Sequence, residues 1–218
     1  MISLGEDTLS HLREQIRPYL TESRYQHTLG VEEEAARIGA IYLPDKIPKL
    51  RVAALLHDIT KRDSLEKQLQ YCEEFGIILE QGGVPFPKPL HASLHARTAM
   101  SVAHRDFADV ADEEILSGVR WHTTGHNEMT VFESIVYLAD YIEPNRTFDD
   151  CIAVREYFWN GIKDADDRKM LVVHLCKTMV YSFDLTLRAL VEEGEPIAAD
   201  TILARNCFLE RVLMLEGK

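Results

Sequence analysis

Positive charge is scarce in this sequence. Its 218 residues include 24 lysines and arginines against 36 aspartates and glutamates, which gives a formal net charge of −12. Such a balance argues against a surface that neutralises the phosphates of nucleic acid or of an anionic membrane, so we expect neither as a partner. A small phosphorylated substrate stays allowed, because a local group of cations or metal ions can dominate a pocket in an acidic protein.

Cysteine pairs, an export signal and long apolar runs are also missing. The four cysteines are far apart and form no CxxC pair, so we expect reduced thiols rather than a disulfide framework or a zinc ribbon. Residues 1–7 contain no basic segment followed by an apolar run, and no stretch elsewhere has the apolar length needed to cross a bilayer. We therefore expect a cytoplasmic protein.

Alternating strand patterns, internal repeats and low-complexity tracts are absent, and the dominant period is helical. After a start at Thr21 or Ser23, apolar positions advance by threes and fours through Ile38, which predicts a helix. His27 lies on the apolar face of this helix, so we expect it to point toward the core. The pattern favours an all-α fold.

Several short signals predict where other helices begin and end. Prolines and paired glycines in residues 82–89 predict a loop, which delivers the chain to a helix starting at about His91. Asp112 is a plausible N-cap, and Thr130 with Glu133 has the spacing of a capping box. Pro144 is expected to end the helix that this box opens.

The adjacent residues His57 and Asp58 are the strongest local signal. They follow residues 51–56, which are apolar nearly all round and predict a central helix containing both residues. Unpaired polar groups are costly there, and a metal would compensate them, since imidazole suits iron, manganese or zinc and a carboxylate can bridge two cations. The alternative is a core pair satisfied by other protein groups or a surface pair.

Asp140 is a second candidate. It shares a helical stripe with Phe132 and Val136, so it should face inward. Its carboxylate could ligate a metal or pair with Arg146 or Arg155, and both readings stay open.

Four further histidines form two pairs with i, i+4 spacing: His91 with His95, and His122 with His126. Each pair lies on one face if its helix is regular. This spacing can bind a metal, but one member of each pair could equally serve as an outer or surface group. A remaining histidine, His174, lies in a stretch whose pattern indicates packing, and we do not expect it to be a ligand.

The order of these candidates resembles the HD superfamily of metal-dependent phosphohydrolases, including its two-metal variant. Four segments look like motifs of the bacterial YqeK-type HD family: residues 24–28 (RYQHT), 55–61 (LLHDITK), 121–125 (WHTTG) and 139–146 (ADYIEPNR). The similarity extends over roughly residues 20–205. It implies an HD-domain helical bundle, a single domain with a core at about 20–150 and a C-terminal helical extension at about 151–218.

The resemblance also implies a metal site of six ligands. It assigns His27, His57, Asp58 and Asp140 to one metal, and His91 and His122 to a second, with Asp58 bridging. Two divalent or trivalent ions are expected, iron first, while manganese and cobalt share these ligands.

Catalytic and substrate-binding roles follow from the same resemblance. It implies catalytic roles for Asp58 and Lys61, and Glu143 is expected to order a ligand or a water. The substrate-binding candidates are Arg24, Lys61, Arg120, His126, Arg146 and Arg155. This chain departs from the family at two positions: His95 stands where a small residue is common, and His126 stands where the family has arginine.

The implied activity is symmetrical hydrolysis of diadenosine tetraphosphate to two ADP by a metal-activated water. Three alternatives stay open: hydrolysis of another nucleotide (a nucleoside polyphosphate, a deoxynucleotide or an alarmone), a di-iron oxygenase, and a non-catalytic nucleotide-binding module. For the implied activity and most of these alternatives, the expected partner is a small-molecule nucleotide. The sequence leaves the oligomeric state open, with a homodimer as one option.

Overall fold

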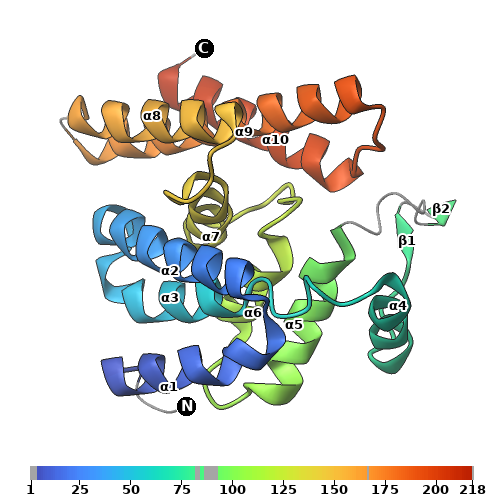
Figure 1. The fold of residues 1–218 in the computed structure, drawn as a ribbon. Helices are drawn as coiled ribbons and strands as arrows, with labels where there is room; N and C mark the ends of the chain where they lie inside the picture. Colours follow the sequence, from blue (N-terminus) through green and yellow to red (C-terminus); the bar gives the residue numbers. More distant parts are fainter. Residues whose placement is uncertain (1–3, 82–83, 86–92, 166, 218) are drawn as a thin grey trace.

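The computed structural model describes residues 4–81, 84–85, 93–165 and 167–217, and these form an all-α fold, as predicted (Figure 1). The helices are α1 (Glu6–Ile16), α2 (Glu22–Tyr42), α3 (Ile47–Leu56), α4 (Leu65–Glu74), α5 (Leu94–Asp106), α6 (Glu113–Trp121), α7 (Val131–Ile142), α8 (Asp149–Lys163), α9 (Arg168–Glu193) and α10 (Ala199–Glu216). Two 3-10 helices, η1 (Arg17–Tyr19) and η2 (Pro44–Lys46), lie between the first helices. Within the described part, the strands are β1 (Glu80–Gln81) and β2 (Val84–Pro85), which pair antiparallel.

The helices form a lower bundle and an upper layer, with α7 between them (Figure 1). Helices α1 to α6 make the bundle, and α8, α9 and α10 lie together above it. Helix α7 contacts α2, α3 and α6 on one side and α8 and α9 on the other. Residues near its C-terminal end therefore lie where the bundle meets the upper layer. The proposed division into a core and a C-terminal extension stays a prediction.

Helix α3 is the centre of the bundle. Residues 52–56 are fully buried, because α1, α2, α6 and α7 all pack around this helix. A helix that is surrounded in this way needs apolar side chains on every face, which is what the sequence provides. Its C-terminal end can therefore deliver His57 and Asp58 deep into the molecule.

The predicted helix starts are confirmed by their caps. The side chain of Thr21 accepts a hydrogen bond from the backbone N–H of Arg24, and Asp112 accepts one from Ile115. Thr130 and Glu133 form both hydrogen bonds of a capping box. Each cap satisfies a backbone N–H that the helix leaves without a partner, a contribution of about 1 kcal/mol.

The structure corrects the prediction that His57 and Asp58 lie inside a helix. Helix α3 ends at Leu56, His57 is its C-cap, and Asp58 lies in the turn that follows. Successive side chains on a helix diverge by about 100°. The turn instead brings the two neighbouring side chains together, with His57 Nε2 3.3 Å from Asp58 Oδ2.

Two other elements differ from expectation. Helix α4, capped by Ser64, is not among the helices predicted from the sequence. Helix α5 begins at Leu94 rather than at about His91, and His91 itself lies outside the described residues.

Helix α9 is a candidate membrane span that the sequence-based expectation overlooked. By length and composition alone it could cross a bilayer, since an 18-residue window has a mean hydropathy of 1.3. The sequence-based expectation that no such stretch exists is therefore wrong. A third of that window is buried here, where α9 packs against α8 and α10. A core helix of a soluble protein passes the same test.

Candidate active site

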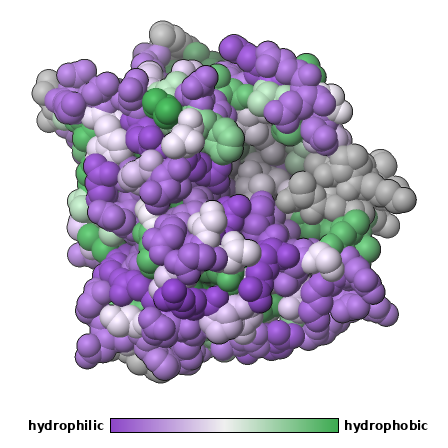
Figure 2. Space-filling view, in the orientation of Figure 1, coloured by the Kyte–Doolittle hydropathy of each residue, from purple (hydrophilic) through white to green (hydrophobic). Residues whose placement is uncertain are grey.

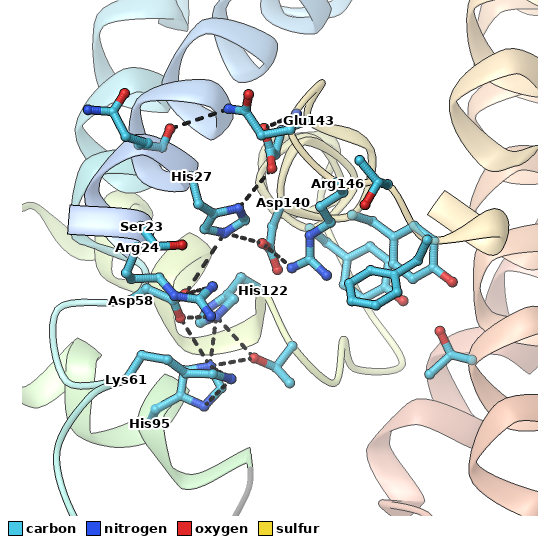
Figure 3. A pocket seen from close by; sticks show the side chains of 18 residues that line it. Ser23, Arg24, His27, Asp58, Lys61, His95, His122, Asp140, Glu143 and Arg146 are labelled. Atoms are coloured by element: carbon cyan, nitrogen blue, oxygen red, sulfur yellow. Dashed lines mark hydrogen bonds and ion pairs between the residues drawn. The ribbon is translucent and has the colours of Figure 1, made fainter. Parts of the chain in front are cut away.

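Six side chains of the kinds that can ligate a metal lie close together, although they come from elements far apart in the sequence; Figure 3 labels all of them except His57. They come from α2, the end of α3, α5, the end of α6 and α7: His27, His57, Asp58, His95, His122 and Asp140. The cavity beside them has a volume of about 720 Å³. Figure 2 shows a recess between the upper layer and the bundle, on a face that is mostly hydrophilic.

One group of donors consists of His27, His57 and Asp140, whose ligand atoms all lie within 4.8 Å of one another. Asp140 Oδ1 is 3.0 Å from His27 Nε2 and 3.7 Å from His57 Nε2. Two imidazoles and one carboxylate suit iron, manganese or zinc.

A second group shares His57 and adds Asp58 and His122. Asp58 Oδ2 lies 3.3 Å from His57 Nε2, whereas Oδ1 lies 3.5 Å from His122 Nε2. His95 joins this group, with its Nε2 3.3 Å from Asp58 Oδ1 and 3.1 Å from His122 Nε2. The two oxygens of Asp58 thus face different sets of histidines, as a bridging carboxylate must.

Three of the rings are oriented by acceptors behind them. The Nδ1 atoms of His57 and His122 lie 2.6 Å and 2.7 Å from the backbone carbonyls of Ala54 and Val119. These carbonyls can only accept, so Nδ1 carries the proton and the Nε2 lone pair faces the cleft. His27 Nδ1 lies 3.0 Å from Glu143 Oε1 in the same manner. Such outer acceptors are typical of histidines that bind metal.

The donor set fits a metal ion. His27 Nε2 and His57 Nε2 are buried and lack a hydrogen-bond partner among the described residues. Ring lone pairs and carboxylate oxygens at these separations repel one another unless a metal ion or a proton lies between them. A metal would satisfy the orphaned nitrogens and offset the charge of the two aspartates.

Residues 24–145, more than half of the chain, match the HD domain family. The chain belongs to the HD domain family. The resemblance found in the sequence is thereby confirmed, and an HD domain implies the binding of divalent metal.

Two curated relatives resemble the chain over most of its length. It is 34% identical over 197 residues to "Bis(5'-nucleosyl)-tetraphosphatase, symmetrical" of Halalkalibacterium halodurans, covering 89% of this chain and 93% of the relative. It is 32% identical over 203 residues to the Bacillus subtilis protein of the same name, covering 92% and 95%.

A solved structure shares the fold. The crystal structure of a predicted HD superfamily hydrolase involved in NAD metabolism from Clostridium acetobutylicum is 30% identical, with a TM-score of 0.75. The match covers 93% of this chain and 97% of that one. The upper layer of α8 to α10 therefore belongs to the shared architecture along with the matched HD domain.

Neighbouring charged and polar groups keep Asp58 and Asp140 ionised. Burial alone would raise the pKa of Asp58, but the nearby histidines lower it well below its usual range. Burial likewise opposes the charge on Asp140, while Arg146 and His27 lower its pKa well below the usual range. Both carboxylates are therefore ready to act as anionic ligands.

The histidines of the HD cleft fall into two classes. Burial lowers the pKa of His95 to about 4 and lowers that of His122 as well, so both rings are neutral at neutral pH and can bind a metal. Burial also disfavours the charged form of His27, yet Asp140 and Glu143 raise its pKa to about 9. A proton and a metal therefore compete for His27 Nε2.

Three predicted phosphate-binding residues line the cleft of the HD domain: Arg24, Lys61 and Arg146. Arg24 Nη1 donates to Asp58 Oδ2 at 2.9 Å, and Arg146 Nη2 donates to Asp140 Oδ1 at 2.7 Å. Asp140 therefore pairs with Arg146, one of the two alternatives that the sequence left open, and its role as a metal ligand stays a prediction. Lys61 Nζ lies 3.2 Å from both ring nitrogens of His95.

The other predicted substrate-binding residues lie outside this cavity. The guanidinium of Arg120 stacks on Trp121, 3.8 Å from the ring centre, and the ring of His126 packs on the same indole. Arg155 donates to the backbone carbonyls of Ile142, Glu143 and Arg146, so it caps the end of α7.

Sequence reasoning assigned His91 to the second metal, whereas His95 is the residue that the structure places beside Asp58. The i, i+4 spacing from His91 was the one signal that pointed to His95. Sequence reasoning also did not identify three aromatic residues that line the cavity, Tyr137, Tyr141 and Phe148. His174, which was not expected to be a ligand, lies elsewhere with Nε2 2.9 Å from the Phe158 carbonyl.

Proposed function

We propose that this protein hydrolyses diadenosine tetraphosphate symmetrically to two ADP in a metal-dependent reaction. The observation that carries the proposal is the position of Asp58, whose two oxygens face two groups of histidines at the floor of a cleft lined by cations. The printed names of the two curated relatives support the choice of substrate. Two metal centres and a row of cations suit a chain of anionic phosphates.

The residues support two ions, with iron as the first expectation. His27, His57, Asp58 and Asp140 would hold one metal. Asp58 and His122 would hold the other, and His95 would supply a further ring nitrogen there. The expectation that His91 contributes stays a prediction, since that residue lies outside the described part of the chain.

The metals would supply positive charge and lower the pKa of a water molecule. The chain's own cations bind the substrate: Arg24 and Arg146 flank the two aspartates, and Lys61 lies beside His95. Guanidinium groups can hold phosphoryl oxygens through paired hydrogen bonds, and an ammonium adds a point charge. The buried rings of His57 and His122 keep their orientation through backbone carbonyls during this step.

The acidic composition supports the remaining expectations. A net charge of −12 favours a small nucleotide partner over nucleic acid or an anionic membrane, and a location in the cytoplasm stays an expectation. A homodimer stays an open option.

The decisive experiment combines metal analysis with a product assay. Freshly purified protein is analysed for bound metal and then offered a panel of dinucleoside polyphosphates and mononucleotides. We expect diadenosine tetraphosphate to be consumed fastest, with ADP as the sole nucleotide product. Preferential consumption of another nucleotide would contradict the proposal. Failure on every phosphorylated substrate, with metals fully loaded, would favour the oxygenase or the binding module.

A further inference from the structure

The cavity continues past the metal-ligating residues into a part that the proposed chemistry does not use. Its wall there consists of Tyr137 and Tyr141 from α7, Phe148 from the α7–α8 connection, and Thr186 from α9. Figure 3 shows the phenyl and phenol rings of the cavity together beside Arg146, away from the labelled histidines. A volume of about 720 Å³ falls in the range of small-molecule sites. This space exceeds what the metals alone require.

Phe148 is unusual among the apolar side chains of the protein. It is 68% exposed, and it is the one exposed large apolar side chain of the described residues that lines this cavity. Its ring contacts no other aromatic ring in the described part of the chain. The residue precedes α8 with an extended backbone and makes no side-chain cap, so helix capping does not explain it.

The two tyrosine rings that line the same part of the cavity pack on each other. Tyr137 and Tyr141 lie one helical turn apart, with centroids 6.2 Å apart and planes within 16° of parallel. The Tyr141 hydroxyl donates to Asp150 Oδ2 at 2.9 Å. A rigid aromatic wall with one free ring beside it is a suitable surface for a flat aromatic ligand, because every nucleobase presents a π-face.

Arg146 connects the two parts of the cavity. It is bound to Asp140 at the metal-ligating side and lies two residues before Phe148 in the chain. A ligand with its phosphate at Arg146 would therefore carry its other end toward the aromatic wall. A nucleotide has this combination of an anionic and an aromatic end.

We propose that Phe148, together with Tyr141, forms the subsite that binds the nucleobase of one nucleotide half of the substrate. The inference deepens the proposed function and rests on it in one respect, namely that the ligand is a nucleotide. It assigns Phe148 to binding specificity and gives it no part in bond cleavage.

The test measures binding and needs no turnover. ADP and inorganic pyrophosphate are titrated separately into the metal-loaded protein by calorimetry, for the wild type and for Phe148→Ala. We expect the substitution to weaken ADP binding by about 5- to 100-fold, the effect of losing one base–aromatic stack, while pyrophosphate binding stays unchanged. Phe148→Trp should restore the affinity for ADP. Ile78→Ala is the matched control, since Ile78 is 70% exposed and lies outside the cavity.

Three results would overturn the subsite: no binding of ADP to the wild type, equal affinity for ADP in Phe148→Ala, or an equal loss for ADP and pyrophosphate. The last would indicate that Phe148 merely orders the segment of Arg146. The proposed function can fail independently of the subsite. If diadenosine tetraphosphate is not hydrolysed but ADP binding depends on Phe148, the subsite stands and the reaction must be revised.

Discussion

His27 Nδ1 lies 3.0 Å from Glu143 Oε1, and both side chains are buried. The other oxygen of Glu143 accepts the backbone N–H of Asn145 at 2.7 Å. Glu143 therefore joins the face of α2 that carries His27 to the turn that follows α7. Gly30, one turn after His27 on α2, leaves the space for this carboxylate, because a Cβ there would overlap with Glu143 Oε2.

Glu143→Gln is expected to weaken metal binding while leaving the fold intact. The amide keeps the size of the side chain but loses the charge that orients His27 and makes its ring a stronger ligand. The loss of an outer partner of this kind typically lowers metal affinity about 10- to 100-fold. Titration of the metal-free protein with Mn²⁺ measures the effect. Unchanged affinity would show that Glu143 does not position His27.

Gly30→Ala is expected to lower activity without destabilising α2. Alanine is a better helix former than glycine by about 1 kcal/mol, so a loss of activity cannot be ascribed to a weaker helix. The added methyl group must instead displace Glu143 or Asn145. Gly5→Ala is the control, since a Cβ at Gly5 meets nothing within 4 Å. Wild-type turnover in Gly30→Ala would mean that the carboxylate can shift at no cost.

Asp58→Ala should abolish turnover in a protein that is still folded. Both metals lose their shared ligand, and we expect a fall of about 100- to 1,000-fold or more, the range for removing one group that stabilises charge in the transition state. Steady-state rates and far-ultraviolet circular dichroism measure activity and helix content. Asp63→Ala, in the same turn but outside the cavity, should behave as wild type. An Asp58 variant with near-normal rates would rule out the bridging role.

The sequence predicted features that depend on local chemistry. The caps at Thr21, Asp112 and Thr130 follow from side chains that bond to backbone a few residues away, so spacing alone was sufficient. The inward direction of His27 and Asp140 followed from helical periodicity in the same way.

Features that depend on tertiary placement could not be predicted. His91 and His95 share a face in any regular helix, so spacing could not select between them; the structure places His95 Nε2 3.3 Å from Asp58 Oδ1. Arg155 carries a charge suited to phosphate, yet it bonds to three backbone carbonyls at the end of α7. Periodicity does not show which distant carbonyls an arginine will meet.

The paired histidines give a prediction about metal content. His95→Ala is expected to reduce the bound metal from two ions per chain to one, because it removes a ring nitrogen 3.3 Å from Asp58 Oδ1. His126→Ala should retain both ions, since that ring packs on Trp121 outside the cavity. Elemental analysis of metal-replete protein gives the count. If His95→Ala keeps two ions while His91→Ala loses one, then His91 alone is the ligand, as the sequence suggested.

The last prediction concerns the bond that breaks. Symmetrical cleavage requires water to attack an inner phosphorus of diadenosine tetraphosphate so that ADP leaves, whereas an asymmetric cut would release AMP and ATP. Arg24 and Arg146 lie on the two aspartates of the cleft, so an inner phosphoryl group held between them would face the metal-ligating atoms. The aromatic wall beyond Arg146 would then receive one nucleoside. Hydrolysis in oxygen-18 water, followed by mass spectrometry of the products, should place one heavy oxygen in one of the two ADP molecules. Heavy oxygen in AMP or ATP would show an asymmetric cut and refute the symmetrical mechanism, while the HD metal site itself would remain supported by the metal content.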